Sequence, residues 1–167
     1  MSLCKIINKP YENKKALLNV ANYIIQEEKC YGVYGCIGIR EHYVVDIVEK
    51  MKDTKKLYSK NNGRQLVHII ISFDEYESTC LTGNDAMEIA YSLQEAFYGY
   101  QVLFGVHQNT EHLHIHFMVN TVSIITGRKF SINSAGAREL EAMVERKFIE
   151  IRQRYNHPIY FQVVSFV

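Results

Sequence analysis

The stretch from His107 to Asn120, HQNTEHLHIHFMVN, holds the residues best suited to chemistry, because four of its fourteen residues are histidine. From His112 onward, apolar and polar residues alternate as in a β-strand, whose successive side chains point to opposite faces. One face is apolar, and the other carries His112, His114, His116, Met118 and Asn120. Burying imidazoles without partners is costly. This row of histidines therefore calls for a metal ion, a substrate phosphate or water.

A strand before this stretch adds another histidine to the row. The segment from Tyr100 to His107 (YQVLFGVH) has the composition of a strand, and the short polar turn from Gln108 to Glu111 makes the two strands a hairpin. The hairpin sets His107 beside His114 and His116. Three imidazoles on two paired strands could hold one divalent ion.

Two further elements carry candidate site residues. A helix is predicted from Asn13 to Gln26, with an apolar face from which Tyr23 points away, near the C-terminal end. Tyr11, Tyr31, Tyr34 and Tyr43 are rival tyrosines in the same part of the sequence. A buried central strand is predicted from Leu66 to Phe73, and His68 and Ser72 share one of its faces.

The remaining elements complete a single domain over residues 1–167. Strands are predicted at Leu3–Ile7 and Ile159–Val167, helices at Glu41–Leu57, Thr82–Phe97 (with Thr82 as N-cap) and Asn133–Tyr155, and a loop or irregular hairpin at Glu27–Ile39. This order predicts an α+β fold with a largely antiparallel central sheet of about five strands. Helices are expected mainly on one face, with the histidine hairpin on the other.

Length and composition indicate an ordinary soluble domain. The chain has 167 residues, of which 47% are hydrophobic and 22% charged, and it contains neither an apolar run of membrane-spanning length nor a secretory signal. Its four cysteines form no CxxC pair, so reduced thiols in a cytosolic protein are expected.

Positive charge is concentrated in one segment, although the whole chain has a net charge of only +1. The segment from Lys50 to Arg64 holds six Lys or Arg and one Asp, a net charge of +5, which leaves −4 for the rest of the chain. Such a segment is either a solvated helix end and loop or a contact for phosphates. The candidate phosphate contacts are Lys55, Lys56, Lys60, Arg64, Arg128 and Lys129.

Three motifs resemble those of HUH endonucleases, specifically the relaxases that mobilise conjugative plasmids and transposons. The histidine stretch matches their pattern at His107, His114, His116 and Asn120, and HIIISFDEYE matches the preceding motif with His68, Ser72 and Glu77. The helix sequence LLNVANYIIQEEK resembles the motif that carries their nucleophile, here Tyr23. GRKFSIN also resembles the segment that follows, so the likeness covers roughly residues 14 to 130.

This resemblance implies an enzyme of the bacterial cytoplasm that nicks one DNA strand at a transfer origin. Tyr23 would form a 5′-phosphotyrosine, with Ser72 and Glu77 as further catalytic residues and His107, His114 and His116 binding a divalent ion, Mg or Mn. Asn109, Asn120 and His112 would support these ligands, although the family has Asp where this chain has Asn109. The implied partners are single-stranded DNA, relaxosome accessory proteins and a coupling protein. Such relaxases usually continue into further domains.

Two other functions are compatible with the same residues. The sequence from His112 to Met118 also fits the alternating pattern of histidine-triad nucleotide hydrolases and transferases, in which a histidine attacks a nucleotide phosphate. That alternative leaves unexplained four residues, namely Tyr23, His68, Ser72 and His107. The second alternative is a non-catalytic HUH domain that binds origin DNA, for which the Asn109 departure is the main argument.

Overall fold

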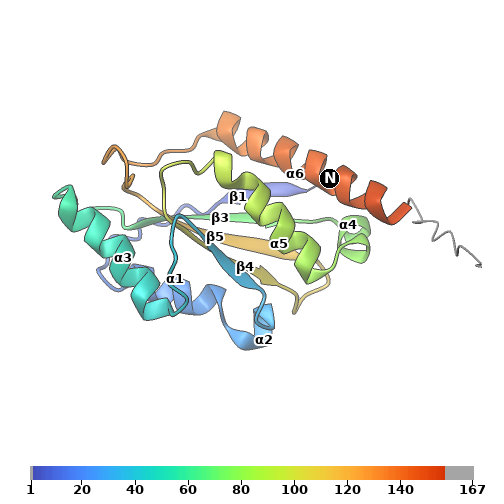
Figure 1. The fold of residues 1–167 in the computed structure, drawn as a ribbon, viewed down its shortest axis with the longest axis horizontal. Coiled ribbons are helices and arrows are strands. Elements are labelled where there is room, and N and C mark those ends of the chain that lie inside the picture. Colours follow the sequence, from blue (N-terminus) through green and yellow to red (C-terminus); the bar gives the residue numbers. More distant parts are fainter. Residues whose placement is uncertain (1, 157–167) are drawn as a thin grey trace, which may run out of the picture.

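One antiparallel sheet forms the centre of the protein in a computed structural model, which describes residues 2–156 (Figure 1). Its strands are β1 (Leu3–Ile6), β2 (Tyr34–Ile37), β3 (Leu66–Ser72), β4 (Val102–His107) and β5 (His114–Asn120). They lie in the order β1-β3-β5-β4-β2, and each neighbouring pair is antiparallel. β5 therefore lies in the middle, between its hairpin partner β4 and the strand β3.

Helices cover both faces of this sheet (Figure 1). One face carries α5 (Gly83–Ser92), the 3-10 turn η1 (Leu93–Glu95) and α6 (Ser134–Asn156). The opposite face carries α1 (Ala16–Ile24) and α3 (Val44–Leu57). Two short helices complete the described chain, namely α2 (Glu27–Cys30) and α4 (Glu75–Cys80).

The alternation along β5 separates two hydrophobic cores. Ile115, Phe117 and Val119 are buried in the core that lies under α5 and α6. On the other face, Met118 joins the core that α1 and α3 form with Leu66 and other strand residues. The same face carries the histidines at the N-terminal end of β5. The core under α1 and α3 and the histidine cluster thus share one face of the sheet.

The α+β class and the antiparallel sheet of five strands are confirmed. Helices are shared between the two faces more evenly than the sequence predicted. The segment Glu27–Ile39, predicted as a loop or irregular hairpin, supplies α2 and the edge strand β2. The predicted strand Ile159–Val167 lies outside the described residues. All four cysteines are free, in agreement with the expectation of reduced thiols.

Capping boxes start the two helices that follow β3. The Thr82 hydroxyl accepts the backbone N–H of Asp85, while the Asp85 carboxylate accepts the backbone N–H of Thr82, so the predicted N-cap is confirmed. Asp74 and Glu77 form the same reciprocal arrangement at α4. These bonds satisfy backbone donors that the first turn of a helix leaves without partners.

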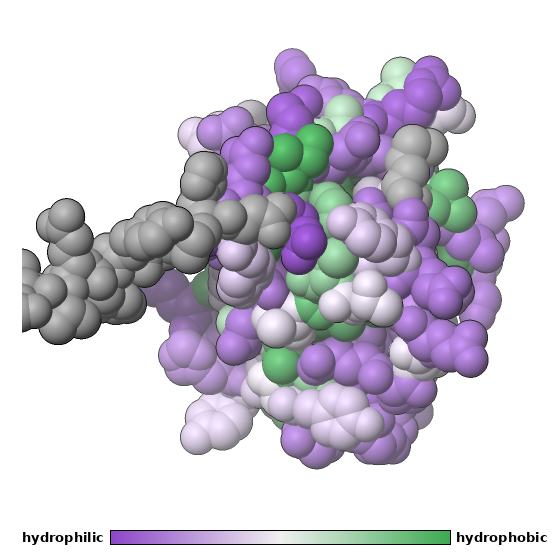
Figure 2. Space-filling view, turned by 90° about the vertical axis from the view of Figure 1, so that its right-hand side faces the viewer, coloured by the Kyte–Doolittle hydropathy of each residue, from purple (hydrophilic) through white to green (hydrophobic). Residues whose placement is uncertain are grey.

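The surface near α4 and the C-terminal end of α6 is mainly hydrophilic, with smaller apolar areas between charged side chains (Figure 2). α6 is the longest helix, and it is tied to α5 by ion pairs from Lys147 and Arg154 to Glu88, at 2.9 and 2.8 Å. Among the helices of residues 2–156, none has the length and apolar character needed to cross a membrane.

Candidate functional site

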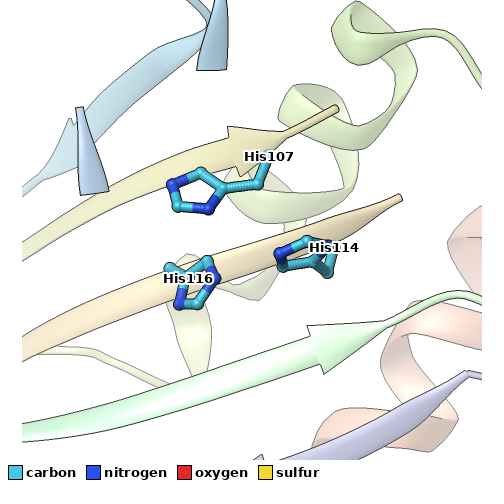
Figure 3. A group of neighbouring side chains, drawn as sticks. All are labelled: His107, His114 and His116. Atoms are coloured by element: carbon cyan, nitrogen blue, oxygen red, sulfur yellow. The ribbon is translucent and has the colours of Figure 1, made fainter. Parts of the chain in front are cut away.

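Three histidines converge at the turn end of the β4–β5 hairpin (Figure 3). His107 lies directly opposite His114 in the strand register, and His116 follows on the same face of β5. One ring nitrogen from each of these side chains lies within 4.8 Å of the others. The sequence prediction that His107, His114 and His116 would come together is therefore confirmed in its geometry.

A close contact between α1 and β4 fixes the position of His107. The His107 Nε2–H donates to the carbonyl oxygen of Ile24, at the last residue of α1, over 2.9 Å. Gly105 makes this approach possible, because a Cβ atom there would lie 2.6 Å from the same Ile24 oxygen. A glycine on β4 thus lets the end of α1 rest on the sheet beside the histidines.

Each histidine of the cluster has one ring nitrogen in a hydrogen bond, which leaves the other for a ligand. His114 Nδ1–H donates to the backbone oxygen of His112 over 2.8 Å, and His116 Nδ1 lies 2.9 Å from Nε2 of His68. His116 Nε2 is buried and has no hydrogen-bond partner among the described residues. Metal-bound histidines typically show this division between a ligating nitrogen and a hydrogen-bonded one.

Burial keeps two of these imidazoles, those of His107 and His116, neutral. Burial, followed by the positive charge of neighbouring imidazoles and of Lys29, holds the pKa of His116 well below its usual range. Burial also lowers the pKa of His107, an effect that its bond to Ile24 partly opposes. A metal ligand must be unprotonated. The ring nitrogens of His107, His114 and His116 that make no hydrogen bond converge and therefore fit a divalent ion, which would have further positions for phosphate oxygens and water.

Tyr23 lies over this cluster. Its ring centroid is 5.4 Å from that of His107 and 5.3 Å from that of His116. The side chain is 42% exposed, whereas the apolar face of α1 is buried, as the helical spacing predicted. The Lys29 ammonium lies 3.9 Å from the centroid of the Tyr23 ring. An accessible phenol, a cation and a candidate metal site thus share one location.

The other two predicted catalytic residues have different surroundings. Ser72 is half-buried and pairs with His114 in the register of β3 and β5, so the sheet brings it beside the cluster. Glu77 is 4% exposed, and its carboxylate accepts the backbone N–H of Asp74 over 2.9 Å in the capping box of α4. This bond gives Glu77 a structural function at the start of a helix.

The residues expected to support the metal ligands lie at different places, and the position of Asn120 contradicts its predicted function. Asn109 is exposed in the hairpin turn, and the imidazole of His112 is exposed just before β5. His112 contributes its backbone oxygen to His114, so its side chain is not the partner. Asn120 lies at the far end of β5, about 20 Å from His114 at the usual rise of a strand. There its amide donates to the Met51 oxygen over 3.0 Å.

Lys55 also needs correction as a phosphate contact. It is 2% exposed, and its ammonium donates to the side chains of Asn120 and Thr121. Burial, followed by the positive charge of Lys129, lowers the pKa of Lys55 to about 8. The helix α3 turns this residue into the core, so Lys55 acts there as a buried donor.

The other basic candidates gather at the surface. Lys56, Lys60, Arg128 and Lys129 are exposed, and Arg64 is half-buried. The Lys60 ammonium donates to the backbone oxygen of Gly127, which joins the two basic segments. Arg64 donates to the backbone oxygens of Ile7 and Lys9 over 3.2 and 3.1 Å. This basic cluster (Lys56, Lys60, Arg64, Arg128 and Lys129) therefore draws on segments that are distant in sequence.

Sequence reasoning assigned no function to Lys29, considered Tyr11 only as a rival of Tyr23, and left His68 open as a residue of the relaxase-like motif or a core polar residue. His68 and Ser72 are four residues apart on one strand, so their side chains point to the same face. This spacing was the signal that His68 faces the cluster, because Ser72 pairs with His114. Tyr11 Oη lies 3.1 Å from Nδ1 of His68. No periodicity marks Tyr11 or Lys29, because both reach the site from irregular segments or very short helices.

Fold and site together define an α+β domain in which one sheet face presents three convergent histidines beside an accessible tyrosine. The chain belongs to the relaxase family: the family description "Relaxase: MobA/VirD2-like, nuclease domain" matches residues 23–153. This membership confirms the resemblance found in the sequence motifs and favours it over the histidine-triad alternative.

Similar proteins come from Staphylococcus aureus and are named protein rlx. One is 35% identical over 83 residues, which is 49% of this chain and 25% of the relative. A second is 29% identical over 90 residues, or 53% of this chain and 26% of the relative. The matched part of the chain thus spans about a quarter of the length of these relatives.

Proposed function

We propose that this chain is the catalytic domain of a DNA relaxase, which nicks one strand of DNA at a transfer origin. In this reaction, Tyr23 Oη forms a bond to the scissile phosphorus while the bond from phosphorus to the 3′ oxygen breaks. The 5′ phosphate remains on the tyrosine, and the other fragment leaves with a 3′ hydroxyl. The phenol loses one proton and the departing oxygen gains one, so the transesterification is balanced.

The contact of Tyr23 with His107 and His116 carries this proposal. A phenol is a poor nucleophile at neutral pH because its pKa is near ~10. Here the exposed phenol contacts the rings of His107 and His116, whose free nitrogens converge with that of His114. A divalent ion held by His107, His114 and His116, Mg or Mn in our proposal, would polarise the scissile phosphate and stabilise the charge that develops on it.

The chain's own residues orient the reacting groups. The Ile24 carbonyl holds the His107 ring, and the His112 carbonyl holds the His114 ring. Lys29 packs on the ring of Tyr23 and adds a positive charge at the place where the phosphate must lie. Ser72, which neighbours His114, is our candidate for a hydroxyl contact to the DNA backbone near the cut.

The basic cluster is our candidate path for single-stranded DNA away from the cut. It lies toward the C-terminal end of β5, about 20 Å from His114 at the rise of a strand. Arg64 connects this cluster to Lys9, whose charge acts on His68 beside the metal ligands. Cations along such a path bind phosphates without reading sequence. Accessory proteins of the relaxosome and a coupling protein, in a bacterial cytoplasm, complete the proposal.

The test is a denaturing gel with a labelled single-stranded oligonucleotide that carries the transfer origin of the element encoding the protein, in the presence of Mn²⁺. We expect a covalent protein–DNA band with the wild type, and loss of this band in Tyr23→Phe and in His114→Ala. Tyr31→Phe is the matched control, because Tyr31 is an exposed tyrosine close in sequence.

The outcomes separate the alternatives. A band that survives Tyr23→Phe would keep the relaxase function but assign the nucleophile to another tyrosine. DNA binding without any covalent band would support the non-catalytic domain that binds origin DNA. Hydrolysis of a dinucleotide, without DNA binding, would restore the histidine-triad function.

A further inference from the structure

His68 lies beside the cluster, and the sequence alone left open whether it acts in the site or is a polar residue of the core. It lies on β3, is 6% exposed, and faces the same side of the sheet as the three histidines. Its Nε2 is 2.9 Å from Nδ1 of His116, and the two ring centroids are 5.1 Å apart. On the other side of the ring, Nδ1 is 3.1 Å from Tyr11 Oη.

The hydrogen bonds that link His116, His68 and Tyr11 have a defined direction, which follows from the free nitrogen of His116. His116 Nε2 is buried without a partner among the described residues, so it can serve as a metal ligand only if it carries a lone pair. A neutral imidazole has one N–H, which must then be on Nδ1 of His116. His68 Nε2 therefore accepts this N–H, and His68 Nδ1–H donates to the hydroxyl oxygen of Tyr11.

We propose that His68 is a positioning residue for the metal centre: it accepts the Nδ1–H of His116, and so fixes the tautomer and the ring orientation in which His116 Nε2 binds a divalent ion. Tyr11 extends this series of hydrogen bonds, because its hydroxyl oxygen accepts the Nδ1–H of His68. This inference rests on the metal centre of the proposed function, but not on the nucleophile.

The partner of His116 is unusual in its chemistry. Metal-bound histidines generally donate their remaining N–H to a carboxylate, a backbone carbonyl or water. His107 and His114 follow that rule, since each donates to a backbone oxygen. His116 lies on the central strand β5, whose backbone N–H and C=O groups are hydrogen-bonded to the neighbouring strands β3 and β4. A side chain from β3 is therefore the means of orienting it, and an imidazole has the required length and acceptor.

The experiment measures Mn²⁺ binding to the DNA-free protein, by calorimetry and by electron paramagnetic resonance. His68→Phe keeps an aromatic ring but removes the acceptor, and we expect it to weaken Mn²⁺ binding about 10-fold or more. His68→Gln can place its amide oxygen near the position of Nε2, and we expect it to restore affinity to within about 3-fold of the wild type. Tyr11→Phe should give an intermediate loss.

Met118→Leu is the matched control for packing. Met118 is buried directly opposite His68 in the strand register but makes no polar contribution, so this variant should bind Mn²⁺ like the wild type. Thermal unfolding of each metal-free variant shows whether its fold is intact. If His68→Phe does not fold, the comparison of His68→Gln and Tyr11→Phe with the control still decides the question.

Equal Mn²⁺ affinity in His68→Phe and the wild type would overturn the inference. An equal loss of affinity in His68→Phe and His68→Gln, with both variants folded, would also overturn it. A loss of affinity in His68→Phe that is largely absent from His68→Gln supports it. If the wild type itself binds no Mn²⁺, the metal centre fails, and the inference fails with it. That result is distinct from a failure of Tyr23 as nucleophile, which only the gel assay with DNA detects.

Discussion

Lys29 and Tyr23 form a cation–π contact, with the ammonium 3.9 Å from the ring centroid, at the point where the first helical segment meets the histidine hairpin. Lys29 is held there by the main chain, because its carbonyl oxygen accepts the backbone N–H of Gln108 over 2.8 Å. The turn that follows His107 thus positions the residue that packs on the candidate nucleophile.

Replacing Lys29 with Met should slow formation of the covalent DNA adduct while leaving the fold intact. An exposed cation–π contact contributes about 0.5–1 kcal/mol, and the positive charge beside the phosphate is lost as well. We therefore expect a rate about 3- to 10-fold lower in single-turnover assays. Lys29→Arg retains the contact and should lose less. Lys15→Met, which removes an exposed lysine before α1, is the control. Unchanged rates in Lys29→Met would show that the contact has no catalytic effect.

Gly105→Ala should separate α1 from the sheet. The new Cβ would lie 2.6 Å from the Ile24 oxygen, a backbone atom that can give way only if the helix shifts. We expect a loss of about 1–3 kcal/mol in the free energy of unfolding, together with a loss of adduct formation, because both His107 and Tyr23 depend on this contact. Urea unfolding and the gel assay measure the two effects.

Gly136→Ala in α6 provides a comparison. Its Cβ would meet the side chain of Ile132 at 3.0 Å, where a flexible group can adjust, and alanine favours a helix. We expect this variant to differ little from the wild type in both assays. A stable and active Gly105→Ala would contradict the assigned function of that glycine.

The histidine hairpin could be predicted because its information is local. Alternation assigns His114 and His116 to one face, and a short turn brings His107 opposite them. Tyr23 could be located off the apolar face of its helix by the same reasoning. These inferences need only the periods of strands and helices and the length of a turn.

Other features depend on contacts between distant segments, which one sequence does not contain. The bond from His107 to Ile24 requires the approach of α1 over Gly105. Lys55 was predicted as a phosphate contact because its sequence neighbours are basic, but α3 directs its side chain toward Asn120. The strand β2 was missed because glycines interrupt it, and its pairing with β4 is what stabilises it.

Acid should destabilise the metal-free protein through its buried histidines. Burial, followed by the charges of Lys9 and His107, lowers the pKa of His68 from 6.5 to about 4, and the pKa values of His107 and His116 are also lowered. Between pH 6.5 and about 4, the unfolded chain therefore binds more protons than the folded protein. The free energy of unfolding should fall as the pH decreases through this window, and remain constant above it as far as these groups are concerned.

Urea unfolding at a series of pH values measures this effect. His68 alone would account for about 3 kcal/mol of the fall. His68→Gln should therefore show a shallower dependence on pH, whereas His42→Gln, which replaces an exposed histidine, should match the wild type. If the free energy of unfolding of His68→Gln depends on pH as steeply as that of the wild type, His68 has the same pKa in the folded and unfolded states.

Lys55 and the exposed lysines should differ in what their removal changes. Lys55→Met leaves acceptors on Asn120 and Thr121 without their buried donor, so we expect a loss of about 1–3 kcal/mol in the free energy of unfolding. The salt dependence of DNA binding should stay the same, because a buried ammonium releases no counterion.

Lys60→Met and Lys129→Met should each reduce the slope of log K against log salt by about 0.7 for a single strand, if each contacts one phosphate. Fluorescence anisotropy with a labelled oligonucleotide at several salt concentrations measures the slope. A reduced slope in Lys55→Met would mean that this lysine leaves the core to meet DNA, and an unchanged slope in the other two would remove the basic cluster from the DNA path.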